Sequence, residues 1–314
     1  MRRRGEVVRT FRHESLLHRG DEGFLAATLP HLGAAIAAGR PALVAVSAPR
    51  IAMLRECLGA DGERVRFVDM SELGANPARI IPAWREFLDA HGGQAVLGVS
   101  EPVWQGRGAE ELRECRLHES LLNRAFGRGP GWHLLCPYDL DALDPDTVAL
   151  ARCTHPHVDE DGVRSRSDRY DPRLATLQLM LSPPAADARA FAFTVDELAD
   201  VRAVVAGAAG TFGLSRERTQ DLVLAASELA TNSITHGGGA GTLRLWRDGG
   251  ELVCQLSDRG RLADPLVGRL RPNERQLTGR GLWIVNQLCD LVQLHSGPDG
   301  TTVRVRMRVR HATA

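Results

Sequence analysis

A carboxylate and a carboxamide stand four residues apart in a stretch that also has the pattern of an amphipathic helix. The stretch, residues 221–237, reads DLVLAASELATNSITHG and leads into a run of glycines. At 3.6 residues per turn its apolar side chains form one stripe, and Glu228 and Asn232 lie side by side on the border of that stripe. A carboxylate can serve as a general base, and an amide oxygen is a suitable hard ligand for Mg²⁺. The spacing therefore predicts a site on this helix.

Two further segments supply chemistry that the helix lacks. The sequence SDRG, residues 257–260, puts Asp258 at the end of an apolar run, where an aspartate can accept a hydrogen bond from an adenine amino group. The sequence GRGL, residues 279–282, opens a predicted helix, and glycines there leave backbone N–H groups free for phosphate. Each segment alone has an ordinary structural interpretation, as a turn or an exposed polar face. Together and in this order they predict a site for ATP and Mg²⁺.

The three segments resemble the N box and the two glycine boxes of the ATPase domain shared by histidine kinases, the Hsp90 chaperone and gyrase. The stretch SELATNSITHG is most similar to the N box of the anti-sigma-factor serine kinases, and the resemblance covers about residues 190–314. It implies that Asn232 holds Mg²⁺ and that Glu228 is the general base. It also implies cofactor contacts from Asp258 and Thr302 at the adenine, from Gly279, Gly281 and Leu282 at the triphosphate, and from Gly260. The first glycine box departs from the family in reading DRGRLADP, where a second glycine is expected.

The elements that must position these residues form an α+β sandwich, with helices on one face of an antiparallel sheet. Ser215 is the expected N-cap of the helix that carries the polar pair. The predicted strands are 191–195, 242–247, 252–257, 291–295 and 302–309, and the predicted helices are 197–212, 216–236 and 282–289. A loop is expected over residues 259–278.

The first half of the chain predicts a different architecture, an α/β domain with a mainly parallel sheet covered on both faces. The predicted strands are 42–47, 65–69, 95–99 and 132–136, and the predicted helices are 50–58, 78–91 and 109–126. The turn after the strand at 42–47 has the position of a nucleotide-binding loop but contains no glycine. We therefore expect no nucleotide to bind there in that manner.

Four dispersed motifs of this half, FRHESLLHRG, RLHESLLNRAF, LLCPYDLDAL and CTHPHV, resemble the sensory domain of methanogens, methylotrophs and many actinobacterial regulators. The resemblance spans about residues 10–160. It implies a degenerate RecA-like fold and the sensing of a small ligand such as a hydrocarbon derivative.

Two kinds of histidine cluster are candidates for further chemistry. Cys153, His155 and His157 have a spacing that would face one way on a strand and could bind a metal, although a structural role is the stronger interpretation. The pairs His13-Glu14 and His118-Glu119 have the order seen in phosphoaccepting helices. Neither lies in a helical hairpin, so a structural role is expected for both.

Composition narrows the class of protein. The 39 basic and 39 acidic residues balance, so no overall field favours nucleic acid or an anionic membrane. All the basic residues are arginines, which rules out a Walker-type phosphate loop with its lysine. No apolar run approaches the length of a membrane span or a secretory signal, and the six cysteines have no disulfide spacing. A cytoplasmic protein is expected.

The sequence thus predicts a sensory domain (1–160), a linker or docking segment (161–190) and a histidine-kinase-like ATPase domain (191–314). We expect an ATP-dependent anti-sigma regulator that phosphorylates an anti-sigma antagonist on serine, or sequesters a sigma factor, and that forms a homodimer. Two alternatives stay open, a sensor histidine kinase and a binding module in which ATP only sets partner affinity.

Overall fold

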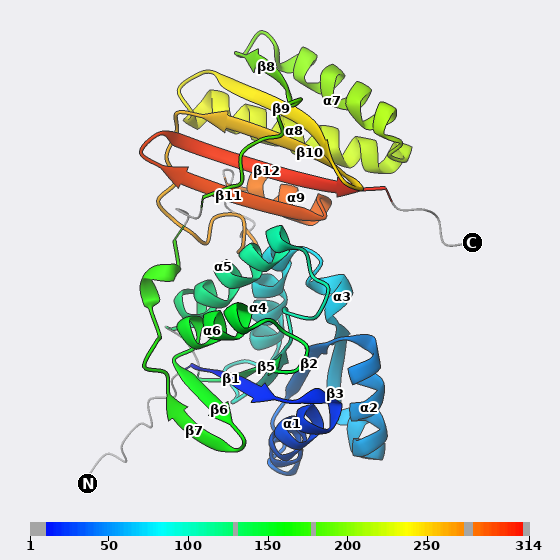
Figure 1. The fold of residues 1–314 in the computed structure, drawn as a ribbon, viewed down its shortest axis with the longest axis vertical. Helices are drawn as coiled ribbons and strands as arrows, with labels where there is room; N and C mark the ends of the chain where they lie inside the picture. The colour runs from blue at the N-terminus through cyan, green and yellow to red at the C-terminus, as the bar shows by residue number, and fades with distance from the viewer. Residues whose placement is uncertain (1–10, 128–130, 177–179, 273–278, 310–314) are drawn as a thin grey trace. The chain divides into compact units, whose positions relative to one another are not determined.

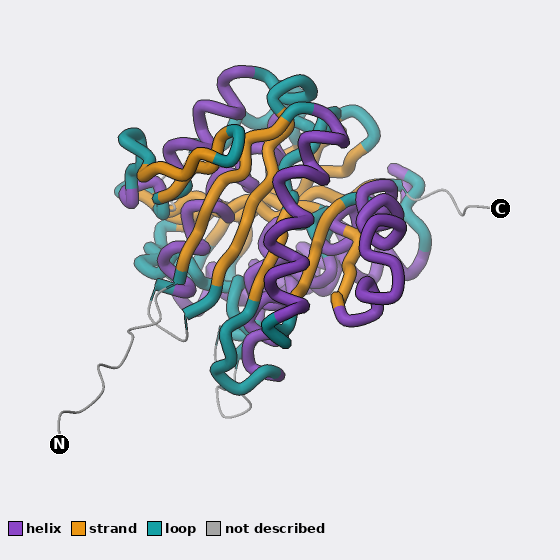
Figure 2. Tube along the Cα trace, turned by 90° about the horizontal axis from the view of Figure 1, so that it is seen from below, coloured by secondary structure: helices purple, strands orange, loops and turns teal. Residues whose placement is uncertain are grey.

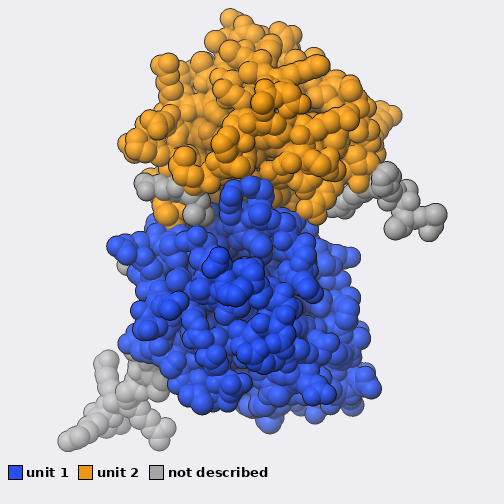
Figure 3. Space-filling model, viewed as in Figure 1, with its two compact units in different colours: residues 1–175 blue, residues 176–314 orange. Residues whose placement is uncertain are grey.

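A computed structural model describes residues 11–127, 131–176, 180–272 and 279–309. The chain divides into two compact units, residues 1–175 and 176–314 (Figure 3). Each unit has its own sheet and its own hydrophobic core, and each is described by itself. No helix in the described ranges is both long and apolar enough to cross a membrane.

The first unit is built on a seven-stranded sheet in the order β3-β2-β4-β5-β1-β6-β7 (Figure 1). All neighbouring pairs are parallel except the hairpin of β6 and β7. The strands are β1 Arg12–His18, β2 Ala42–Val46, β3 Val65–Asp69, β4 Leu97–Ser100, β5 His133–Asp139, β6 His157–Glu160 and β7 Val163–Arg166. The prediction of a mainly parallel sheet is confirmed.

Helices cover both faces of this sheet, as Figure 2 shows. On one face, side chains of α1 (Gly20–Ala37) and α2 (Ala48–Leu58) form one core with the strands. On the other face lie α4 (Ile80–Ala90), α5 (Ala109–Phe126) and α6 (Pro145–Thr154), with the short α3 (Met70–Leu73) before them. Gly98 of β4 marks how closely α4 approaches, since a Cβ there would lie 2.9 Å from the Trp84 ring.

The strand β1 and the helix α1 were not predicted from the sequence, although β1 lies inside the sheet between β5 and β6. The reason is that β1 buries His13, Glu14 and Ser15 at 1% exposure or less, so that no continuous apolar run marks the strand. The first strand of the sheet is β1, so the turn that follows the first strand is at Arg19. The prediction that this turn follows the strand at 42–47 was wrong. The backbone N–H of Gly20 at the true position donates to Asp139 Oδ1 (3.1 Å), so a carboxylate lies where a phosphate would bind.

The second unit is a five-stranded antiparallel sheet in the order β11-β12-β10-β9-β8. Its strands are β8 Arg189–Phe193, β9 Gly241–Asp248, β10 Glu251–Asp258, β11 Leu291–Gly297 and β12 Gly300–Arg308. Its helices, α7 Leu198–Phe212, α8 Arg216–His236 and α9 Gly281–Leu288, share one core with the inner face of the sheet and lie behind the strands in Figure 1. The α+β prediction is confirmed.

The outer face of this second sheet is polar but not open to water. Arg304 is 1% exposed, stacks over the Trp246 ring at 5.0 Å and donates to Gln255 Oε1. The segment before β8 crosses this face, where Ser182 O accepts from Arg304 Nη2 (2.6 Å). Arg304 and Arg306 on this face are therefore buried with paired guanidinium groups.

The segment between the units begins later than predicted. β7, over residues 163–166, pairs with β6 and so belongs to the sheet of the first unit. The sequence analysis had placed these residues in the linker. Part of the predicted loop at 259–278, residues 273–278, lies outside the described residues.

Candidate nucleotide site

The helix α8 carries the polar pair because of how its apolar stripe is buried. Ser215 caps the helix, with its Oγ accepting from Arg218 N (3.2 Å). The residues of α8 that face the core are Leu222, Ala225, Ala226, Leu229, Ala230 and Ser233. Glu228 and Asn232 stand at the border of this stripe and are half-buried, as their spacing predicts.

Asp258 at the end of β10 is held by two hydrogen bonds. Ser233 Oγ of α8 donates to its Oδ2 (2.6 Å), and the backbone N–H of Gly260 donates to its Oδ1 (2.8 Å). The close approach of α8 depends on Gly237, because a Cβ there would lie 2.4 Å from Asp258 Cγ. The carboxylate is thereby fixed at the carboxyl end of α8.

The amino end of α9 rests on the polar pair of α8. Gly281 is its first residue, and a Cβ at this position would lie 2.8 Å from Glu228 Oε2 and 3.2 Å from Asn232 Nδ2. Gly279 has a φ of +87°, which a residue with a side chain rarely adopts. The three segments that the sequence separates by up to 54 positions, from Glu228 to Leu282, thus meet in space.

A cavity of about 430 Å³ opens between these segments. Of the eight predicted site residues, Asn232, Asp258, Gly260, Gly279, Gly281 and Leu282 line it. Its apolar wall consists of Leu229, Leu256, Leu262, Val267, Leu282 and Val303. A cavity with an apolar wall that is also lined by a carboxylate and by a helix amino terminus suits a nucleotide, with the base against the apolar wall and the phosphates at α9.

Two predicted site residues do not line the cavity. Glu228 lies next to it, beneath Gly281. Thr302 lies on the outer face of the sheet, because Val303 and Val305 face the core and side chains alternate along a strand. Its hydroxyl lies 3.0 Å from Ser257 Oγ. Thr301 lines the cavity instead and donates to Gly260 O (2.9 Å).

Ser233, Thr301 and Arg261 are among the polar cavity residues that were not predicted as site residues. Ser233 is one turn after Leu229 on the buried stripe, which is a signal that the sequence does contain. The prediction of Thr301 would have required the register of β12 against β10, in which Thr301 pairs with Asp258. A pairing register between distant strands is not visible in the sequence alone.

The loop after Gly260 is anchored at its far end to α9. Gly268 has a φ of +72°, and its carbonyl accepts from Asn286 Nδ2 (2.9 Å). A Cβ on Gly268 would lie 2.8 Å from Leu282 Cβ, so glycine permits this approach. Leu262 and Val267 are thereby placed in the cavity wall.

In the first unit the predicted metal group is not assembled. Cys153 lies in α6, His155 is the C-cap of that helix and His157 begins β6, so the three do not share a strand. His155 instead faces His13, Glu119 and Cys136. Both predicted His-Glu pairs are buried, with all four residues at 1% exposure or less, so neither histidine is accessible as a phosphoacceptor.

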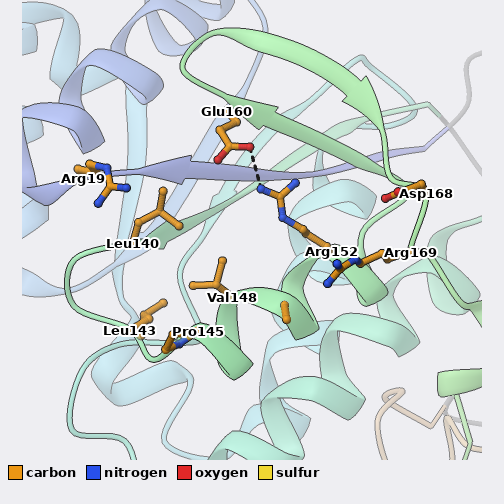
Figure 4. Close-up of a pocket in the computed structure, with 10 residues that line it drawn as sticks. Arg19, Leu140, Leu143, Pro145, Val148, Arg152, Glu160, Asp168 and Arg169 are labelled. Atoms are coloured by element: carbon orange, nitrogen blue, oxygen red, sulfur yellow. Dashed lines mark hydrogen bonds and ion pairs between the residues drawn. The ribbon is translucent and has the colours of Figure 1, made fainter.

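The first unit has an open cavity of its own, of about 620 Å³ (Figure 4). It lies beyond the carboxyl ends of β1 and β5, where α/β sheets bind ligands, and Leu140, Leu143 and Val148 form its apolar floor. At its rim Arg152 of α6 forms an ion pair with Glu160 of β6 (2.7 Å). This is a candidate position for the sensed ligand.

The second unit has the antiparallel sheet and helices of the histidine kinase-like ATPase domain. Comparison with family models agrees, because residues 191–307 match the histidine kinase-like ATPase domain. Residues 12–156 match the model described as the methanogen/methylotroph, DcmR sensory domain. The chain therefore combines a sensory domain with a histidine-kinase-like ATPase domain.

No curated protein matches the chain. Among solved structures it is similar to the RsbU and RsbW domains of Rv1364c from Mycobacterium tuberculosis, at 21% sequence identity and a TM-score of 0.30. That match covers 40% of this chain and 34% of the other, so it spans about a third of the length of that relative.

Proposed function

We propose that the second unit binds ATP with Mg²⁺ and transfers phosphate to a serine of an anti-sigma antagonist protein, in a regulator that also binds a sigma factor. The first unit would set this activity in response to a small ligand, and the active form would be a homodimer. The observation that carries the proposal is the meeting of Gly281 with Glu228 and Asn232 at a cavity that Asp258 also lines.

Each residue has a role that its position allows. Asp258, whose orientation is set by Ser233 and Gly260, accepts a hydrogen bond from the adenine amino group. The role that the family resemblance gave to Thr302 passes to Thr301, its neighbour on the inner face. The bound Mg²⁺ would neutralise charge on the phosphates, and Asn232 supplies an oxygen ligand for it.

The N–H groups at the amino end of α9 and the helix dipole attract the phosphates. The chain has no lysine, and Arg261, which also lines the cavity, adds a positive charge. Glu228, beside Asn232, accepts the proton of the serine hydroxyl as its oxygen attacks the terminal phosphorus, and ADP leaves. Serine specificity rests on the resemblance of the N box to that of the serine kinases.

The test separates binding from transfer with two variants and one control. Glu228→Gln should retain ATP affinity within about twofold and lose transfer by at least about a hundredfold, as expected when a general base is removed. Asn232→Ala should lose both. Glu217→Gln, an exposed glutamate in the first turn of the same helix, is the matched control and should behave as wild type.

The measurements are calorimetric titration with Mg-ATP and transfer of radiolabelled phosphate to candidate antagonist proteins. Acid-stable, base-labile phosphoprotein is the expected product, and an acid-labile product would identify a histidine kinase instead. If wild-type protein binds ATP and a sigma factor but labels no antagonist, phosphotransfer is not its function.

That last outcome is the second candidate function, a module in which ATP sets the affinity for a partner. It is favoured by the position of Glu228, which lies behind Gly281 rather than in the cavity lining. In this case Glu228→Gln would leave partner affinity unchanged with and without ATP, whereas Asn232→Ala would abolish the effect of ATP.

A further inference from the structure

Four side chains with metal-binding groups converge inside the first unit. They are His13 of β1, Glu119 of α5, Cys136 of β5 and His155 at the end of α6, and each is 1% exposed or less. Their ligand atoms all lie within 4.8 Å of one another. His13 and Cys136 face the same side of the sheet, because β1 and β5 pair with His13 opposite Leu134, two residues before Cys136.

We propose that His13, Glu119, Cys136 and His155 form a tetrahedral site for a divalent transition-metal ion of the Zn²⁺ type. The site is within the sensory unit and is separate from the proposed nucleotide site.

Three of the six distances between the ligand atoms are close to those that such an ion imposes. Glu119 Oε2 lies 3.0 Å from His13 Nε2 and 3.1 Å from His155 Nε2, and Cys136 Sγ lies 3.4 Å from His13 Nε2. In tetrahedral zinc sites, bonds of about 2.0–2.1 Å to nitrogen or oxygen and about 2.3 Å to sulfur put neighbouring ligand atoms about 3.3–3.6 Å apart. The observed separations lie within a few tenths of an ångström of these values.

Both imidazole rings are oriented by their other nitrogen. Asn123 Nδ2 donates to Thr154 O (2.8 Å), which turns Asn123 Oδ1 toward His13 Nδ1 at 3.2 Å. His155 Nδ1 lies 2.8 Å from Ala151 O, a group that only accepts. Each Nδ1 is therefore the donor, and in the neutral ring each Nε2 is left with a lone pair. This is the outer-shell arrangement that orients histidines toward metals.

That tautomer makes the cluster unfavourable without a cation. Two Nε2 lone pairs and a carboxylate oxygen face one another, and the Cys136 thiol, 3.4 Å from His13 Nε2, supplies the one proton that the neutral rings leave among them. In the described part of the chain Glu119 forms no ion pair with an arginine, and its Oε1 is buried with no hydrogen-bond partner. Zn²⁺ bound by one carboxylate, one thiolate and two neutral imidazoles has no net charge, which suits an interior position.

A small cavity lies beside the cluster. It has a volume of about 30 Å³ and is lined by Glu119, Tyr138 and Ala151 among others. About 10–15 Å³ is enough for one water molecule. A water-sized molecule therefore fits beside Glu119, the one cluster residue that lines this cavity.

The experiment uses the full chain and measures metal in two ways. Protein purified and dialysed in metal-free buffer should contain one equivalent of metal per chain by elemental mass spectrometry. After exchange with Co²⁺, it should show the intense visible bands of tetrahedral cobalt and a near-ultraviolet thiolate-to-cobalt charge-transfer band.

The variants assign that band to one cysteine. Cys136→Ser should lose the charge-transfer band and bind the metal at least about tenfold more weakly, because the thiolate ligand is gone. Cys115→Ser is the matched control, since Cys115 is also buried in the first unit but donates to Pro102 O (3.2 Å) rather than facing the cluster. Circular dichroism shows whether each variant is folded.

Two results would overturn the proposal. One is wild-type protein that takes up neither zinc nor cobalt at equimolar concentration, which would make the cluster a hydrogen-bonded network. The other is a charge-transfer band that survives in Cys136→Ser or disappears in Cys115→Ser. If Cys136→Ser does not fold, the wild-type and Cys115→Ser spectra still decide, because the band must be present in both.

Discussion

Gly281→Ala is the substitution that separates the shape of the nucleotide site from the stability of the domain. The new Cβ would lie 2.8 Å from Glu228 Oε2 and 3.2 Å from Asn232 Nδ2. Both are ends of flexible, half-buried side chains, so they can move by a few tenths of an ångström. Alanine is also preferred to glycine within a helix by roughly 0.5–1 kcal/mol, which offsets the cost of that movement. The melting temperature should therefore change by no more than a few degrees.

ATP affinity should fall much more than stability does. The methyl group lies where α9 meets the polar pair, so it displaces Asn232 and keeps phosphate from the first N–H groups of the helix. Loss of a hydrogen bond to a charged group costs about 1.5–3 kcal/mol, which corresponds to a fall in affinity of at least about tenfold.

The assay is calorimetric titration with Mg-ATP beside a thermal melt. Gly210→Ala is the matched control, because Gly210 is also helical, in α7, and a Cβ there meets nothing within 4 Å. If Gly281→Ala binds ATP as wild type does, the phosphates do not lie at the amino end of α9. Our reasoning about the site would then be refuted.

Two other predictions follow from the sheet register and from one buried carboxyl group. Thr301→Val should weaken Mg-ATP binding about three- to tenfold, because one hydrogen bond is lost. Thr302→Val, on the outer face, should leave Mg-ATP affinity unchanged. Equal effects of the two variants in a calorimetric titration would contradict the assignment of Thr301 to the inner face. Burial raises the pKa of Glu101 to about 7 despite Arg50 beside it. The folded state therefore holds this proton more tightly than the unfolded chain does. The contribution of Glu101 to the free energy of unfolding is fully present below about pH 4.5 and is lost as the pH rises through 7. Denaturant unfolding between pH 5 and 8 should show a fall in the free energy of unfolding of at most about 3 kcal/mol. In Glu101→Gln the free energy of unfolding should depend less on pH. If the pH dependence is unchanged in that variant, other groups cause the loss.

Much of the second unit could be predicted from sequence because its signals are local. The N-cap Ser215, the buried stripe of α8 and the Asp-Gly-Gly turn between β9 and β10 each lie within a few residues of the element that they define. The site followed from three short segments whose order is informative. The face of the sheet on which Thr302 lies could not be predicted, because it depends on the pairing of β12 with β10. No local sequence pattern determines that pairing.

The first unit could be predicted less well because its central strand breaks the rule that an interior strand is apolar. β1 carries His13 toward α5 and α6, and Glu14 toward the opposite face, where it accepts from His133 Nε2 (2.7 Å). Periodicity cannot identify such a strand, since the polar residues interrupt the apolar run. The partners of His13 lie more than 100 positions away in sequence.

The buried polar residues that prevented the prediction of β1 also indicate the role of this strand. Burying histidine and glutamate in the middle of a sheet lowers the stability of the fold unless each polar group has a partner. Such buried groups are therefore expected where a partner or a bound ion compensates them. Glu14 has such partners, since His133, Arg12 and Arg164 surround it. For Glu119 no arginine does so among the described residues, and two histidines turn lone pairs toward it. This difference between the two faces of one strand separates an internally paired cluster from one that a cation completes.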